Sequence, residues 1–120
     1  MEIKYKINIA KDFSKYPAGR YRTEGNASGE AFLTDYLLGV LLACIIEKVK
    51  VEINLTGMNG YPSSFISGSI GKISYELGKR IGQDESSMVL KEHIVFICDD
   101  SLARKAAFEK EIESPITPKR

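Results

Sequence analysis

Several residue types that carry chemistry are scarce in this chain. It has one histidine, His93, and two cysteines, Cys44 and Cys98, which form no CxxC pair. A structural zinc site needs about four nitrogen or sulfur ligands close together. We therefore expect no metal site, and we expect two buried, reduced thiols instead of a disulfide. No Gly-x-Ser-x-Gly elbow supplies a nucleophile for the histidine, which is expected to be structural.

An excess of one charge is also missing. The chain has 17 basic and 16 acidic residues and a net charge of +1. Proteins that bind nucleic acid or anionic membranes gather basic residues on one face, so neither partner is expected. The most apolar segment, 36–46, is about eleven residues long against the roughly twenty that span a bilayer, and it predicts a core helix. Residues 2–9 contain no signal-peptide core, which predicts a cytoplasmic protein.

The remaining composition suits one folded domain. The chain has 120 residues, of which 43% are hydrophobic, enough to form a core. Alternating or helical spacing of apolar residues predicts a strand at 3–9, a helix at 28–47, a strand at 49–55, a helix at 65–81, one long strand or a strand pair within 87–98, and a helix at 101–113. The inward residues of the first helix are expected to be Leu33, Leu37, Val40, Leu41, Cys44 and Ile45.

Strands that are joined through helices pair largely in parallel. The predicted fold is therefore an α/β sandwich, with a largely parallel or mixed sheet of about four strands that helices cover. The predicted domain covers residues 1–113. A proline-containing, flexible tail is expected at 114–120.

Two serines, Ser63 and Ser64, stand at the predicted start of the helix at 65–81. The first turn of a helix has unpaired backbone amides and the positive end of the helix dipole, so it favours an anion. A phosphoserine there adds roughly 1.5 to 2 negative charges. Serine is also among the commonest N-cap residues. Capping and signalling both stay open on this pattern.

The same region resembles a known family. The strand, the residues Asn54-Leu55-Thr56-Gly57-Met58, the pair Ser63-Ser64 and the apolar helix resemble the core of the STAS domain of anti-sigma-factor antagonists. In those regulators a serine kinase of the histidine-kinase-like ATPase superfamily phosphorylates the second serine. The resemblance implies this role for Ser64, with Ser63 as its neighbour. Those regulators usually carry aspartate before the pair and glycine after it, where this chain has Pro62 and Phe65.

A second resemblance covers most of the chain. It is to the STAS-like family of uncharacterised prokaryotic proteins, and the residues that carry it are Phe13-Ser14, Tyr16-Pro17-Ala18-Gly19-Arg20-Tyr21, Ser28-Gly29 and Gly60-Tyr61-Pro62-Ser63-Ser64-Phe65. That family has no settled activity, so this resemblance implies the fold. The resemblance to anti-sigma-factor antagonists implies a non-catalytic regulatory or protein-interaction domain. The partner would be a histidine-kinase-like ATPase or serine kinase, bound through Gly60, Tyr61, Pro62 and Phe65. A homodimer through Tyr61 and Phe65 is the alternative use of that surface.

The long connection at 11–27 supports an alternative function. Arg20, Arg22 and the amides near Ser28 would form a phosphate cradle, which predicts a module that senses a nucleotide or phosphate. Packing of the loop through its aromatic residues is the competing interpretation.

An enzyme has the least support. The carboxyl ends of parallel strands meet at one edge of a sheet, which places Asp99 and Asp100 beside the turn at 56–64. These aspartates would either cap the next helix or bind a cation or transfer a proton. The segment 67–73 looks like a phosphate-binding loop but has Ile73 at the hydroxyl position. Its glycines, Gly68 and Gly71, are expected to permit close packing. We therefore predict a non-catalytic protein without a cofactor.

Overall fold

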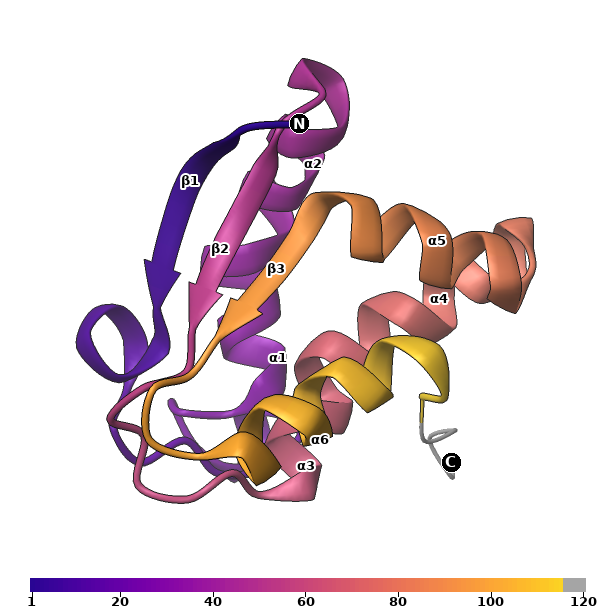
Figure 1. Cartoon of the computed structure of the whole chain (residues 1–120). Helices are drawn as coiled ribbons and strands as arrows, with labels where there is room; N and C mark the ends of the chain where they lie inside the picture. Colours follow the sequence, from indigo (N-terminus) through magenta and orange to yellow (C-terminus); the bar gives the residue numbers. More distant parts are fainter. Residues whose placement is uncertain (116–120) are drawn as a thin grey trace.

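Three parallel strands form the sheet of this protein, in the order β1-β2-β3 (Figure 1). The computed structural model describes residues 1–115. The strands are β1 (Ile3–Asn8), β2 (Lys50–Asn54) and β3 (Ile94–Ile97). In the register, Ile53 of β2 lies between Ile7 of β1 and Phe96 of β3. The predicted α/β class with parallel pairing is confirmed, and β1 and β3 are the edge strands.

Helices connect the strands. Their bounds are η1 (Ile9–Phe13), η2 (Arg22–Glu24), α1 (Gly29–Phe32), η3 (Leu33–Leu37), α2 (Leu38–Glu47), α3 (Ser63–Ile66), η4 (Ser67–Gly71), α4 (Lys72–Ile81), α5 (Gln83–His93) and α6 (Leu102–Glu113). The turns η1, η3 and η4 are π-helical, and η2 is a 3₁₀ turn. Because α1, η3 and α2 are continuous, we call residues 29–47 the first long helix. In the same way, residues 63–81 are the second long helix.

The region 87–98 differs from its prediction. Helix α5 occupies most of it, so the described sheet has three strands where about four were predicted. The buried residues of α5 are Ser86, Leu90 and His93, whose spacing of four and three is helical. Two of these three residues are polar, so the spacing is not visible as an apolar pattern. The apolar residues at 94–97 alone form the strand.

The core lies between the sheet and the two long helices. Val51 and Ile53 of β2 are completely buried, and so are Phe32, Phe65 and Phe108 from three different helices. The first long helix lies behind the sheet in Figure 1. Alternation along β2 leaves Lys50, Glu52 and Asn54 half-buried on the opposite face. Within the described residues, that face has no helix over β1 and β2 (Figure 1).

The first long helix is apolar on both sides. Leu37, Leu41 and Cys44 are buried, whereas Leu42, Ile45 and Ile46 are 52%, 40% and 79% exposed. The predicted inward position of Ile45 is therefore wrong. By length and composition alone, these 19 residues form a helix that is able to cross a membrane. Core helices of soluble proteins pass the same test, and here the inner side packs on the sheet.

The two long helices cross at a pair of glycines. A β-carbon at Gly29 would lie 2.5 Å from the carbonyl oxygen of Phe65, and one at Gly68 would lie 2.7 Å from the carbonyl oxygen of Arg20. Side-chain carbons do not approach backbone atoms this closely, so glycine is required at both positions. The expected packing role of Gly68 is confirmed.

The described chain ends just after α6, whose C-cap is Ser114. Of the predicted flexible tail, residues 116–120 lie outside the described residues. The domain boundary at residue 113 stays a prediction.

Candidate functional site

The serine pair begins the second long helix without capping it. Pro62 occupies the N-cap position and offers no side-chain hydrogen bond. Ser63 is exposed and Ser64 is half-buried. Within the described residues, neither hydroxyl makes a hydrogen bond. No hydrogen bond in the described structure therefore supports the interpretation of these serines as helix caps.

The first-turn amides show where an anion would be favoured. The amides of Phe65 and Ile66 both donate to the carbonyl oxygen of Pro62, at 3.0 and 3.2 Å. The amides of Ser63 and Ser64 precede the first intrahelical bonds and make no backbone hydrogen bond in the described structure. They point, with the helix dipole, toward the space in front of the helix.

Arg104 fixes the loop that leads into this helix. Its side chain is 9% exposed. Its Nη1 donates to the carbonyl oxygen of Leu55 at 3.2 Å, and its Nη2 donates to that of Met58 at 2.8 Å. The guanidinium also lies 6.0 Å from the centre of the Tyr61 ring. A buried cation thus holds the first half of the connection between β2 and the serines, at Leu55 and Met58.

Asp100 completes the network at the carboxyl ends of the strands. It accepts hydrogen bonds from the Cys98 thiol at 3.2 Å, the Gly57 amide at 3.1 Å and Arg104 at 2.6 Å. The bond from the thiol, the bond from the amide and the charge of Arg104 lower the pKa of Asp100. Neither aspartate caps α6, because the N-cap is Ser101, whose hydroxyl accepts from the Arg104 amide. The carboxylate is a structural anchor for the turn.

The predicted partner-binding residues divide between surface and core. Gly60 is exposed and has a φ of 86°, and Tyr61 is 38% exposed. Pro62 is half-buried. Phe65 is completely buried and stacks with Phe13 at a centroid distance of 6.1 Å. The side chain of Phe65 therefore belongs to the core and not to the surface.

The predicted anion-binding residues do not converge on one point. Arg22 pairs with Asp35, and this contact lowers the pKa of that carboxyl group. The hydroxyl of Ser28 is buried and accepts from the Ala31 amide at 3.2 Å. Of the three, only Arg20 contacts the second long helix, whereas Arg22 contacts the first. A three-residue phosphate cradle is not what the structure forms.

Arg20 joins the loop at 11–27 to the second long helix. Its Nε and Nη2 donate to the hydroxyl oxygen of Ser67 at 3.0 and 2.7 Å. That hydroxyl donates in turn to the carbonyl oxygen of Ser64 at 3.3 Å. The guanidinium is thus one helical turn from Ser64.

Arg20 also lines a hollow of about 370 Å³ between the two long helices. The other residues that line it are Tyr21, Glu30, Leu33, Thr34, Ser67, Gly68, Lys72, Tyr75, Glu76 and Lys79. The hollow therefore combines three cations and two carboxylates with two tyrosines and one leucine.

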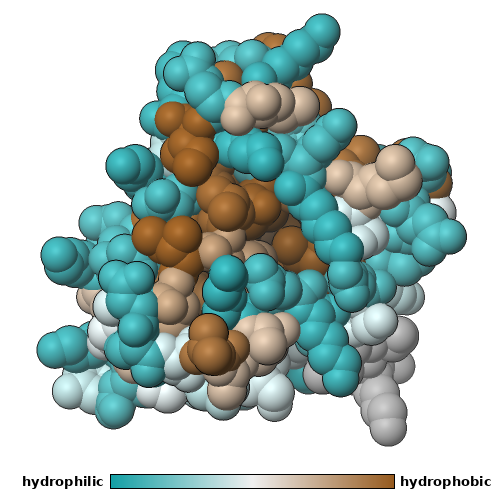
Figure 2. All heavy atoms as spheres, viewed as in Figure 1, coloured by the Kyte–Doolittle hydropathy of each residue, from teal (hydrophilic) through white to brown (hydrophobic). Residues whose placement is uncertain are grey.

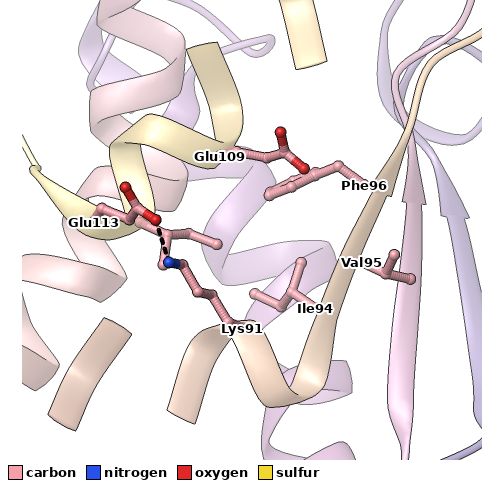
Figure 3. A pocket seen from close by; sticks show the side chains of 7 residues that line it. Lys91, Ile94, Val95, Phe96, Glu109 and Glu113 are labelled. Carbon is pink, nitrogen blue, oxygen red and sulfur yellow. Dashed lines mark hydrogen bonds and ion pairs between the residues drawn. The ribbon is translucent and has the colours of Figure 1, made fainter. Parts of the chain in front are cut away.

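A second hollow, of about 390 Å³, lies beside β3 (Figure 3). Ile94, Val95 and Phe96 line it in succession. Because neighbouring side chains in a strand point to opposite faces, this hollow touches the free edge of the sheet. Lys91 and Glu113 form an ion pair across it (Figure 3). Figure 2 shows apolar side chains gathered over the strands on the same side of the molecule.

The remaining candidate residues have structural roles. The ring of His93 is buried, and its Nδ1 lies 2.9 Å from the carbonyl oxygen of Val49. Cys44 is buried and Cys98 is partly buried, and both are free thiols. Within residues 1–115, no group of three or more histidine, cysteine, aspartate or glutamate side chains is placed to hold a metal ion.

Comparison with models of protein families, with curated proteins and with solved structures found no match for this chain. The geometry therefore carries the functional argument. Arg104 was not singled out from the sequence, because an arginine in an amphipathic helix looks like a surface residue. Lys72 and Tyr75 were not singled out either, since only the crossing of the two long helices brings them to Arg20.

Proposed function

We propose that this protein is a non-catalytic STAS-like regulatory domain. It binds a protein partner at the surface formed by residues 60–64, and phosphorylation of Ser64 controls that binding. The partner is a histidine-kinase-like ATPase or serine kinase, by the resemblance of the serine pair to anti-sigma-factor antagonists. We further propose that the protein works in the cytoplasm, where such a kinase has ATP.

One observation supports this function above the others. The two serine hydroxyls begin the second long helix while Pro62 occupies the cap position. A serine that capped the helix would use its hydroxyl oxygen in a hydrogen bond to a backbone amide. These serines make no such bond in the described structure, so their hydroxyls are available for modification.

The position also favours the product of phosphorylation. A phosphate at the first turn adds roughly 1.5 to 2 negative charges next to free amides and the positive end of the helix dipole. It therefore changes the charge of the surface without opposing the helix. Arg20, one turn away through Ser67, adds a positive charge on the side of Ser64.

The surface around the serines is held in place before any partner binds. Arg104 and Asp100 fix the turn after β2, and Tyr61 is exposed above the Arg104 guanidinium. A partner that binds Gly60 and Tyr61 thus meets an ordered surface and loses little conformational entropy on binding. Its affinity then depends on the charge at Ser64.

The test combines a phosphorylation assay with a binding assay. The wild-type protein is incubated with host lysate and ATP and analysed by intact mass, together with Ser64→Ala and the matched control Ser63→Ala. We expect one phosphate on the wild type and on Ser63→Ala, and none on Ser64→Ala. The partner recovered with the wild type is then identified and its affinity for Ser64→Asp is measured, with Ser63→Asp as the control.

We expect the loss of affinity for Ser64→Asp to be at least tenfold larger than that for Ser63→Asp, about 1.4 kcal/mol. A phosphate that persists in Ser64→Ala would assign the modification to another residue. Equal affinity of the partner for Ser64→Asp and for the wild type would contradict control of binding by Ser64.

A further inference from the structure

The hollow between the two long helices lies where both of these helices widen. Leu33 and Thr34 come from the π-helical turn η3, and Ser67 and Gly68 come from the π-helical turn η4. A π turn displaces side chains from their ordinary helical positions and occurs often at functional sites. Two such turns that line one hollow distinguish it from the hollow beside β3, which regular elements surround.

The hollow contains a cation, Arg20, with an acidic neighbour, Glu24. Hydrogen bonds from the Tyr21 and Arg20 amides and the charge of the Arg20 guanidinium lower the pKa of Glu24. Arg20 is half-buried, and both hydrogen bonds of its side chain go to one neutral oxygen, the hydroxyl of Ser67. Within residues 1–115 it forms no ion pair. In the hollow beside β3, by contrast, Lys91 is paired with Glu113. A guanidinium that retains donors and faces a hollow is suited to bind a carboxylate or phosphate.

The other charged groups of the hollow are at its mouth. Lys72 and Lys79 both pair with Glu76, at 3.1 and 3.2 Å, and these contacts lower the pKa of Glu76. Their side chains are about half exposed. Glu30 also lines the hollow, so its lining carries three cations and two carboxylates. The lining is therefore positive by one charge, which favours an anion near Arg20.

The walls of the hollow accept a ring. Tyr75 lines it, and the Lys79 ammonium lies 4.9 Å from the centre of the Tyr75 ring. Leu33 from η3 adds an apolar side chain, and Tyr21 adds a second aromatic one. The volume of about 370 Å³ is at the lower end of the range for small-molecule sites, roughly 300 to 1,000 Å³.

We propose that this hollow is a binding site for a small organic anion that contains an aromatic ring. Arg20 binds the carboxylate or phosphate, Lys72 and Lys79 attract it, and Tyr75 and Leu33 contact the ring. This site goes beyond the proposed regulatory function, because none of residues 60–64 lines the hollow. The proposal of this site therefore does not depend on the proposed switch at Ser64.

The experiment is a titration of the ¹⁵N-labelled protein with three probes, followed by amide chemical shifts. Benzoate and phenyl phosphate each supply a ring and an anion, whereas inorganic phosphate supplies the anion alone. We expect both aromatic probes to shift the amides of residues that line the hollow, Thr34 and Gly68 among them. Inorganic phosphate is expected to bind at least about tenfold more weakly than phenyl phosphate, because it makes no contact with the ring walls.

Variants connect the binding to the residues. Arg20→Gln should weaken phenyl phosphate by roughly tenfold to a hundredfold, since it removes a charged hydrogen-bond donor. Lys72→Gln should weaken it less, and because Lys72 is exposed, this variant is expected to remain folded if Arg20→Gln does not. Arg80→Gln is the matched control, because Arg80 is an exposed cation on α4 outside the hollow.

Four results would overturn the proposal. The first is the absence of shifts with both aromatic probes at millimolar concentration. The second is equal affinity for inorganic phosphate and phenyl phosphate, which would indicate charge attraction only. The third is an Arg80→Gln variant that loses as much affinity as Lys72→Gln. Shifts that are confined to residues 60–64 would equally exclude the hollow as the site.

Discussion

Gly29 and Gly68 meet backbone to backbone where the two long helices cross. A β-carbon at Gly29 would lie 2.8 Å from the α-carbon of Gly68. This contact positions the π-helical turns η3 and η4 against each other, and with them the hollow that contains Arg20. The stability of the crossing and the shape of the hollow thus depend on the same two residues.

Gly29→Ala is expected to destabilise the protein by about 1–3 kcal/mol, because the added methyl group forces the helices apart. Gly39→Ala is the matched control in the same helix, since nothing lies within 4 Å of a β-carbon there. The control should gain roughly 0.5–1 kcal/mol from the better helix propensity of alanine. Urea denaturation of both variants measures the difference. Equal stability of the two would show that the crossing is not tightly packed.

Arg104→Met is expected to cost about 2–3 kcal/mol, because it leaves the carbonyl oxygens of Leu55 and Met58 without their charged donor. The Gly57 amide should also exchange faster with deuterium, since Asp100 loses the partner that holds it. Lys105→Met, one position along α6, removes only a surface contact of 4.0 Å to Glu109 and should change the stability little. An unchanged exchange rate at Gly57 would contradict the anchoring role of Arg104.

Acid should lower the stability of the fold, partly because it protonates Asp100. The hydrogen bonds from Cys98 and Gly57 and the charge of Arg104 hold its pKa below the ordinary 3.8. A carboxyl group with a lowered folded pKa stabilises the fold above its unfolded pKa, and this contribution is lost as the pH falls through the folded value. The free energy of unfolding should therefore decrease below about pH 4, and less steeply in Asp100→Asn.

Asp99→Asn is the control for that measurement. It makes the same change of charge beside Asp100, but within the described residues the Asp99 carboxylate accepts no hydrogen bond. Urea titrations across the acid range should give this control the slope of the wild type. If both variants flatten the slope equally, the effect comes from general charge repulsion and not from the bonds of Asp100.

The two thiols should react at different rates. Burial, followed by the nearby charge of Glu47, raises the pKa of the Cys44 thiol, and its side chain is completely buried. Cys98 is partly exposed at the end of β3. Because the thiolate is the reactive form, a thiol reagent at about pH 8 should label Cys98 quickly. It should label Cys44 only when the protein unfolds. Cys98→Ser should abolish the fast phase, and Cys44→Ser should leave it unchanged.

The sequence was sufficient for the elements whose buried residues are apolar. The second long helix was predicted at 65–81 from the spacing of its isoleucines and leucines, and it is found at 63–81. Helix α5 was missed because serine and histidine supply two of its three buried positions. Arg104 was missed because it too is a buried polar residue. Its burial depends on contacts with the turn after β2 and not on its neighbours in the chain.

The candidate site could be predicted only where it is local. The placement of Ser63 and Ser64 at the start of a helix follows from adjacent residues and agrees with the structure. The separation of Arg20 from Arg22 could not be predicted, because it depends on contacts with Ser67 and Asp35. Those contacts form only when the chain is folded.

The parallel order of the strands also determines how late the sheet can form. Ile53 pairs with Ile7 and with Phe96, each more than forty residues away along the chain, so no strand pair can begin as a hairpin. During synthesis, β1 cannot pair until β2 has been made. The sheet is complete only after β3 has been made and has paired with β2. Contacts of such long range make folding slow for a protein of this size. The nascent chain therefore has an unpaired β1 until β2 (Lys50–Asn54) has been made.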